Sequence, residues 1–224
     1  RTMTLMLLVP DVANNFFAEI VQDFSIACRE KGYKVFLGDT INQSSVEEDY
    51  LNMLKEGVVD GAVVVPMMDG QNDELYFELA RKRFPLVMID RIVDRIKSSY
   101  VIVDNFEGGR LVADHLYKKG HRCCGYIGGD TMKVQAFQDR FNGFAQTLAK
   151  NGEALNEDYV YTNCPSPDQG VIEGIKKLMA LPKPPTAVFA DNDLNAIACI
   201  AALRQMGYRV PDDVAVVGYD NINI

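Results

Sequence analysis

Polar side chains with ligand-binding chemistry follow several short, β-branched apolar segments of the sequence. Asp90 and Arg91 come directly after one such segment, and Asp220 comes after another. Carboxylates accept hydrogen bonds from neighbouring hydroxyls and an arginine donates them, so this combination suits a polyhydroxylated ligand. Phe16 adds an aromatic face for the apolar side of a ring. The residue types predict a site for a small polar molecule.

Helix capping is the alternative explanation for Asp and Asn at strand ends, because both residue types are favoured N-caps. It is the preferred interpretation of Asp193, which precedes an apolar helical pattern. Asp90 and Asp220 precede no such pattern, so capping does not explain them. Phe17 fits the apolar stripe of the first helix, whereas Phe16 lies off that stripe and is the better ligand candidate.

Arg140 lies near the start of the helix expected over residues 135–151. It is expected to point away from the apolar stripe of that helix, where a solvated side chain is the default interpretation. Only the family resemblance described below makes it a binding candidate.

The sequence contains no motif of a common catalyst or metal site. It lacks a G-x-S-x-G elbow, a phosphate-binding G-x-x-x-x-G-K-[ST] loop, an H-E-x-x-H pair and a spaced Cys/His ligand set. The only histidines, His115 and His121, have no nucleophile partner in the sequence. We therefore expect no catalysis, no cofactor and no metal.

Composition narrows the class of protein further. The 224 residues are 48% hydrophobic and 24% charged, which is enough chain for two packed lobes. The net charge of −8 and the scattered Lys and Arg argue against nucleic-acid binding by this stretch alone.

The five cysteines have no C-x-x-C spacing, which suits reduced thiols in the cytoplasm. The adjacent Cys123 and Cys124 are expected on opposite faces of a strand. No membrane span or export signal is evident in this stretch.

Apolar strands alternate with amphipathic helices, which predicts an α/β protein with parallel sheets covered by helices on both faces. Residues 1–103 are expected to form an N-terminal lobe with four strands and three helices, and residues 104–224 a C-terminal lobe. Ligands of parallel sheets bind where the strands end, so the polar residues named above should gather there. The expected strands, all buried on both faces, are residues 5–9, 62–65, 86–89, 100–103, 123–127, 186–189 and 214–217.

Seven stretches covering essentially the whole chain in order resemble the LacI/GalR family of bacterial transcriptional regulators. They are VPD at 9–11 with NNFFAEI at 14–20, VDG at 59–61, MIDR at 88–91, VDN at 103–105, KGHR at 119–122, YIGG at 126–129 and VPDDVAVVGYD at 210–220. The resemblance implies a periplasmic-binding-protein-like type I fold of two Rossmann-like lobes that close on an effector in the cleft between them.

It further implies a cytoplasmic homodimer that binds operator DNA through an upstream helix-turn-helix domain absent from this chain. The fold would also be incomplete at its C-terminus, because the family's last crossover lies beyond Ile224.

Carried over by position, the resemblance implies a pocket for a sugar-like effector. Its residues would be Asn14, Phe16, Phe17, Asp90, Arg91, Arg140, Asn192 and Asp220. Relatives often place an aromatic near residue 165, where this chain has Asn163-Cys164-Pro165-Ser166-Pro167. One wall of the pocket should therefore be less aromatic.

A periplasmic sugar-binding protein of an ABC transporter is the alternative function, because it shares this fold and much of the pocket. The unpaired cysteines, the lack of an export signal and the stretches at 120–122 and 210–214 favour the regulator. The upstream coding sequence would discriminate the two, since one requires a helix-turn-helix and the other a signal peptide.

Overall fold

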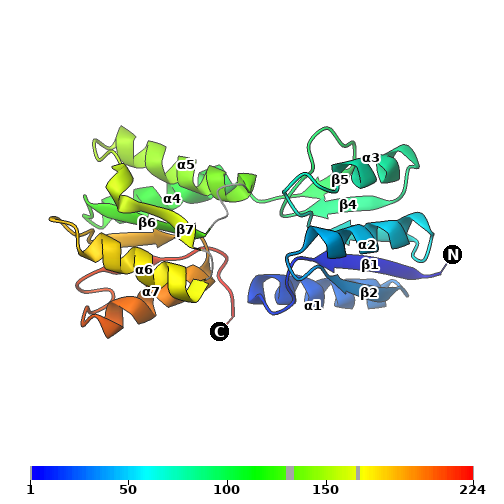
Figure 1. Cartoon of the computed structure of the whole chain (residues 1–224), viewed down its shortest axis with the longest axis horizontal. Coiled ribbons are helices and arrows are strands. Elements are labelled where there is room, and N and C mark those ends of the chain that lie inside the picture. Colours follow the sequence, from blue (N-terminus) through cyan, green and yellow to red (C-terminus); the bar gives the residue numbers. More distant parts are fainter. Residues whose placement is uncertain (1, 130–133, 165–166, 224) are drawn as a thin grey trace. The chain divides into compact units, whose positions relative to one another are not determined.

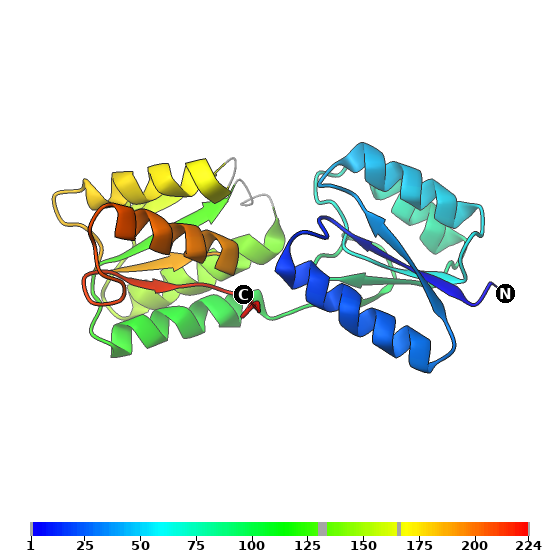
Figure 2. The ribbon, with the colours of Figure 1, turned by 90° about the horizontal axis from the view of Figure 1, so that it is seen from below.

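The computed structural model describes residues 2–129, 134–164 and 167–223, which form two α/β units. The first unit contains the chain up to Val103 together with Ile222 and Asn223, and the second runs from Asp104 to Asn221. Each unit has its own parallel sheet with helices on both faces (Figures 1 and 2). The predicted α/β class with parallel sheets is confirmed.

The sheet of the first unit has five strands in the order β2-β1-β3-β4-β5. Its elements along the chain are β1 (Thr4–Val9), α1 (Asn15–Glu30), β2 (Lys34–Asp39), α2 (Ser44–Lys55), β3 (Gly61–Val64), α3 (Asp73–Arg81), β4 (Leu86–Ile89) and β5 (Ser99–Val101). The prediction of four strands was wrong, because it missed β2. This strand lies at the sheet edge, and its short apolar run of Val35, Phe36 and Leu37 is only partly buried or exposed.

The side chains along β1 point alternately to the two faces of the sheet, which explains how helices pack on both faces. Met6 and Leu8 point to the face where α2 and α3 pack. Leu7 and Val9 point to the opposite face and contact Phe17 of α1. Because successive strand residues face opposite ways, a continuous apolar run supplies both cores.

The second unit contains a four-stranded sheet in the order β7-β6-β8-β9. Its elements are α4 (Asn105–Lys118), β6 (Cys124–Gly129), α5 (Gln135–Lys150), the short 3-10 helix η2 (Glu157–Tyr159), β7 (Val160–Cys164), α6 (Pro167–Met179), β8 (Ala187–Ala190), α7 (Asp193–Gln205) and β9 (Ala215–Val217). Tyr126 and Phe189 face α4 and α5, and Ile127 and Val188 face α6 and α7. The sequence prediction did not include β7, which is again an edge strand.

The prediction that every strand is buried on both faces was wrong for two edge strands. In β5, Tyr100 is 58% and Val101 67% exposed. The residues of β9 are only partly buried. A strand at the edge of a sheet has a neighbour on one side only, so an apolar sequence there does not ensure burial.

Two glycines allow α4 and α5 to cross with their backbones in contact. A Cβ atom on Gly109 would overlap the main-chain carbonyl of Arg140, and one on Gly143 would overlap that of Phe106. The crossing fixes the start of α5, where Arg140 lies.

No helix within the described ranges is long and apolar enough to cross a membrane.

Candidate functional site

The end of each sheet at which its strands finish, here called its carboxyl edge, carries the predicted ligand residues. In the first unit Asn14 follows β1 and caps α1, because its side-chain oxygen accepts a hydrogen bond from the Phe16 N–H at 3.0 Å. Asp11 makes a similar local bond, accepting from the Ala13 N–H at 2.8 Å. Capping therefore uses the oxygen of Asn14 and leaves its amide N–H₂ as the group that could reach a ligand.

The two phenylalanines at the start of α1 differ in burial. Phe17 is 5% exposed and belongs to the core under α1, as its place on the apolar stripe predicts. Phe16 is half-buried and packs on the same core, with its ring edge-on to Phe17 at a centroid separation of 5.1 Å. Phe16 is therefore anchored by its neighbour, and the rest of its surface is accessible.

Asp90 and Arg91 follow β4 and form an ion pair across adjacent residues, with 3.3 Å between Arg91 Nε and Asp90 Oδ2. Asp90 has φ of 64°, in the left-handed region that non-glycine residues rarely occupy. Its N–H donates to the Val101 carbonyl at 3.0 Å, which extends the pairing of β4 with β5. Both side chains are mostly buried, with side-chain exposures of 15% and 13%. Such strain in a non-glycine residue is common at functional sites.

The centre of the carboxyl edge in the second unit is Arg140. The prediction that this side chain points away from the core was wrong, since Arg140 is 4% exposed. Its Nε donates to Asn105 Oδ1 at 2.8 Å, and its Nη1 donates to the Asp191 carbonyl at 2.6 Å. Arg140 and the buried Phe144 are four residues apart on α5, which places them on one helix face.

Tyr219 and Asp220, which follow β9, complete the surroundings of Arg140. The guanidinium carbon lies 3.7 Å from the centroid of the Tyr219 ring, a cation–π contact. Arg140 Nη2 is 3.6 Å from Asp220 Oδ1, and Asp220 has φ of 104°. Burial raises the pKa of Tyr219, and the charge of Arg140 partly opposes that shift.

Asp191 connects the end of β8 to this network. It is 1% exposed, and its carboxylate accepts hydrogen bonds from Asn195 Nδ2 at 2.6 Å, Asn192 Nδ2 at 3.0 Å and the Gly129 N–H at 3.1 Å. Asn192 caps α7 by accepting from the Asn195 N–H at 2.8 Å. Asp193, for which capping was the preferred interpretation, is instead the first residue of α7. Both polar groups of the Asn192 side chain are thus engaged within the unit.

Three residues of the Arg140 network were missed as site candidates from the sequence: Asn105, Asp191 and Tyr219. Each stands next to a strand end, in the segments VDN, ADND and GYD. Position at a strand end was therefore a usable signal, but it does not tell which side chain of a polar run points inward.

The departure at residues 163–167 cannot be placed in this site. Pro165 and Ser166 lie outside the described residues, so the prediction of a less aromatic wall stays a prediction. Among the residues that the structure describes, no group of three or more His, Cys, Asp or Glu is arranged to hold a metal ion.

Both edges carry hydrogen-bonding groups beside an aromatic ring. In the first unit a carboxylate, a guanidinium and a phenylalanine ring lie after β1 and β4. In the second unit a buried guanidinium is held by an amide, a carbonyl and a carboxylate. Both sets of groups include hydrogen-bond donors and acceptors.

Comparison with known proteins places the chain in a family. A family model described as "Periplasmic binding protein-like domain" matches residues 113–224. The HTH-type transcriptional repressor PurR of Mannheimia succiniciproducens is 32% identical over 222 residues, which are 99% of this chain and 66% of the repressor. PurR of Vibrio cholerae is 34% identical over 224 residues, with coverages of 100% and 66%. The chain thus spans 66% of the length of these curated relatives.

Solved structures of transcriptional regulators show the same family relationship. The complex of the transcriptional regulator CelR with cellobiose superposes with a TM-score of 0.86 and 30% identity, covering 99% of this chain and 68% of that chain. A LacI family transcriptional regulator from Mycobacterium smegmatis superposes with a TM-score of 0.80 and 26% identity, covering 96% of this chain and 77% of that chain. The likeness thus extends over nearly the whole of this chain. We conclude that the chain belongs to the LacI/GalR family and forms a periplasmic-binding-protein-like, effector-binding part of such a regulator.

Proposed function

We propose that the carboxyl-edge groups of the two units bind a small polar effector, a sugar or sugar derivative. The observation that carries this proposal is the buried Arg140, held by Asn105, Asp191 and Asp220 at the end of the second sheet. A buried guanidinium with fixed partners is pre-organised to donate to hydroxyl or carbonyl oxygens. Phe16, with Asp90 and Arg91, would supply a stacking face and further polar contacts.

The relatives support the class of ligand. CelR, a 30% identical regulator, has been solved with the disaccharide cellobiose. The mixture of Asp, Asn and Arg with aromatic rings in this chain suits the same chemistry, because hydroxyls need both donors and acceptors.

We further propose that the complete protein is a transcriptional regulator without enzymatic activity. It would act in the cytoplasm as a homodimer and bind operator DNA through a helix-turn-helix segment outside this chain. Repressor relatives of greater length support this proposal. The effector would act by favouring one conformation, and its differential affinity would set the size of the response.

Ligand screening tests the proposed site. A panel of cellobiose, ribose, nucleosides and phosphosugars should include a compound that raises the melting temperature by mass action. Calorimetry with that compound should show that Asp90→Asn and Asp220→Asn each weaken binding by about tenfold or more, the effect of losing one charge-assisted hydrogen bond.

Asp213→Asn is the matched control, because Asp213 pairs with Arg209 at the surface, 2.6 Å from its Nη2. This variant should bind the effector like the parent. Equal affinity in all three variants would show that the binding site lies elsewhere.

A further inference from the structure

A buried hydroxyl in the second unit, that of Tyr126, has no hydrogen-bond partner in the described part of the chain. Tyr126 lies in β6 and is fully buried, with its ring edge-on to Phe141 at 5.0 Å and to Phe189 at 5.5 Å. Buried polar groups in native proteins are nearly always hydrogen-bonded, because an unmade bond costs stability. A phenylalanine would make the same ring contacts without that cost, so packing alone does not explain the hydroxyl.

The Tyr126 hydroxyl lies close to the carboxyl edge because Gly128 has no side chain. A Cβ atom on Gly128 would lie 2.9 Å from Tyr126 Cε1 and 3.5 Å from the hydroxyl oxygen, so the ring runs over the glycine toward the end of β6. The same Cβ position is 3.2 Å from Asp191 Oδ2. The hydroxyl is therefore placed near the Asp191 carboxylate, within the network of Arg140.

The charges of Asp191 and Arg140 both act on this hydroxyl. Burial is the main cause that raises the pKa of Tyr126, the negative charge of Asp191 raises it further, and the positive charge of Arg140 opposes the shift. The group is therefore a neutral phenol at physiological pH, with one hydrogen to donate. The Asp191 carboxylate already accepts three hydrogen bonds, and Arg140 Nε and Nη1 already donate to Asn105 and to the Asp191 carbonyl.

We propose that Tyr126 is a specificity-determining residue of the effector site, whose hydroxyl donates a hydrogen bond to a hydroxyl oxygen of the effector. This inference rests on the proposed function, because it adds a donor to the carboxyl-edge site of the second unit. An anionic group would fit less well, since the network contains the carboxylates of Asp191 and Asp220 but only one guanidinium, that of Arg140. A sugar hydroxyl can accept from Tyr126 and donate its own hydrogen to a carboxylate at the same edge.

Burial of the Tyr126 hydroxyl links effector binding to a change of conformation. Its oxygen is covered by protein atoms, so an effector reaches it only after neighbouring side chains move. The hydrogen bond then forms only in the bound conformation, and its free energy adds to the differential affinity that shifts the protein between conformations. The protein without effector is less stable for the unmade bond, as is common where function opposes stability.

The stability of Tyr126→Phe tests whether the hydroxyl lacks a partner in the protein without effector. Removal of an unpaired buried hydroxyl should raise the melting temperature by about 2–4 °C. A lower melting temperature would show that the hydroxyl is already hydrogen-bonded, for example to a buried water, and would overturn the proposal.

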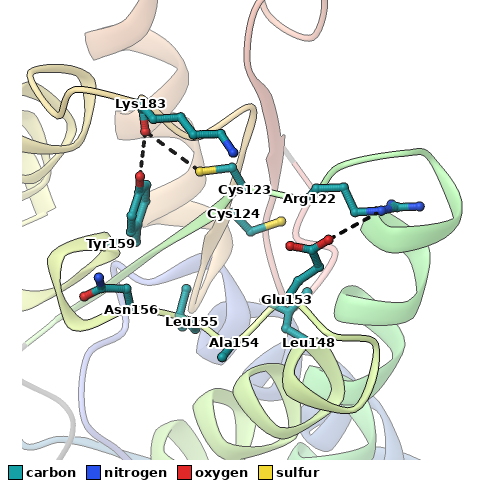
Figure 3. Close-up of a pocket in the computed structure, with 10 residues that line it drawn as sticks. All are labelled: Arg122, Cys123, Cys124, Leu148, Glu153, Ala154, Leu155, Asn156, Tyr159 and Lys183. Atoms are coloured by element: carbon teal, nitrogen blue, oxygen red, sulfur yellow. Dashed lines mark hydrogen bonds and ion pairs between the residues drawn. The ribbon is translucent and has the colours of Figure 1, made fainter.

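Tyr159→Phe is the matched control, because it removes the same atom from a hydroxyl that has a partner. Figure 3 shows Tyr159 in the wall of a cavity of about 100 Å³, with its hydroxyl directed at the Lys183 carbonyl, to which it donates at 2.7 Å. The cavity lies where strands begin, since Tyr159 directly precedes β7 and Cys124 opens β6. Cys123 precedes β6, so the expected placement of Cys123 and Cys124 on opposite faces of a strand does not apply. Loss of the Tyr159 hydrogen bond should lower the melting temperature, which is the opposite of the change expected for Tyr126→Phe.

Calorimetry tests the contact between Tyr126 and the effector. The probe is the compound, among cellobiose, ribose, nucleosides and phosphosugars, that most raises the melting temperature of the parent. Tyr126→Phe should bind this compound about tenfold more weakly, the effect of one lost hydrogen bond, and Tyr159→Phe should bind it like the parent. Equal affinities of Tyr126→Phe and the parent would overturn this inference and leave the proposed function intact. A parent that binds none of these compounds would contradict the proposed function and this inference with it.

Discussion

Single residues at the carboxyl edges divide into those whose side chains cap helices and those whose backbones are strained. Asn14 and Asn192 use their oxygens as N-caps. Asp90 and Asp220 cap no helix and have positive φ values of 64° and 104°. Helix capping therefore accounts for the positions of the two asparagines. The two aspartates are instead held in their strained backbone conformations by the surrounding fold.

Substitution at Asn14 can separate a capping role from a binding role. Asn14→Ala should cost about 1 kcal/mol of stability, because the Phe16 N–H loses its acceptor. Asn14→Ser should retain the cap and the stability, while effector affinity falls by about fivefold for the lost amide contact. Urea unfolding and calorimetry measure the two effects. If Asn14→Ser binds the effector like the parent, Asn14 is only a cap.

Glu47 is a buried carboxylate away from the predicted site. It is fully buried and accepts hydrogen bonds from the Tyr76 hydroxyl at 2.6 Å, Asn72 Nδ2 at 2.7 Å and the Met67 N–H at 2.8 Å. These bonds tie α2 to the segment after β3 and to α3. Burial raises the pKa of Glu47 above 4.5, although its hydrogen bonds oppose the shift.

The raised pKa predicts a pH dependence of stability. Between pH 4.5 and the pKa in the folded state, the folded protein holds a proton that the unfolded chain has released. The contribution of Glu47 to stability is therefore complete below pH 4.5 and decreases as pH rises through that interval, by about 1.4 kcal/mol per unit of pKa difference. Urea unfolding of the parent and Glu47→Gln over this range should show the parent losing stability relative to the variant. A difference that is constant with pH would show that Glu47 has an ordinary pKa.

At the scale of elements, the decisive contact is the crossing of α4 and α5. Gly109 and Gly143 each lie against a main-chain carbonyl of the other helix. This reciprocal contact leaves no space for a side chain and brings Arg140 close to Asn105. The position of Arg140 therefore depends on two glycines that carry no chemistry of their own.

Gly143→Ala should lower the free energy of unfolding of the second unit by about 2–3 kcal/mol, because the added methyl overlaps the Phe106 carbonyl. Asn142→Ala is the matched control on the same helix. Its side chain is exposed, so it should change stability by less than about 0.5 kcal/mol. Hydrogen exchange should show the loss of protection in α4 and α5. Equal free energies of unfolding for the two variants would mean that α4 and α5 can move apart at the crossing without loss of stability.

Periodicity alone identified the central strands and the edge strands β5 and β9, but it missed the edge strands β2 and β7. It also placed Arg140 on the solvent side of α5. The i, i+4 relation of Arg140 to Phe144 was visible in the sequence, but a charged residue was assumed to be solvated. The error has a physical cause, because an arginine can be buried when tertiary partners satisfy its donors.

At the scale of the whole molecule, charge limits what this chain can do alone. Its net charge of −8 opposes association with phosphate backbones. The chain should therefore not shift a DNA duplex in a gel even at low ionic strength, where electrostatic binding is strongest. The full-length regulator should bind its operator under the same conditions. Binding of DNA by this chain alone would contradict the proposed assignment of DNA contact to another segment.

The sequence by itself determined the α/β class, the central strands and the polar residues at strand ends, because hydrophobic period and residue type are local properties. Tertiary structure decided which of those polar groups are caps, which are buried and which meet. Arg140, Asn105, Asp191 and Asp220 come from four separate segments, and only the packing of helices on the sheet brings them together. A buried charge requires partners supplied by the whole fold, so no local pattern could have specified this network.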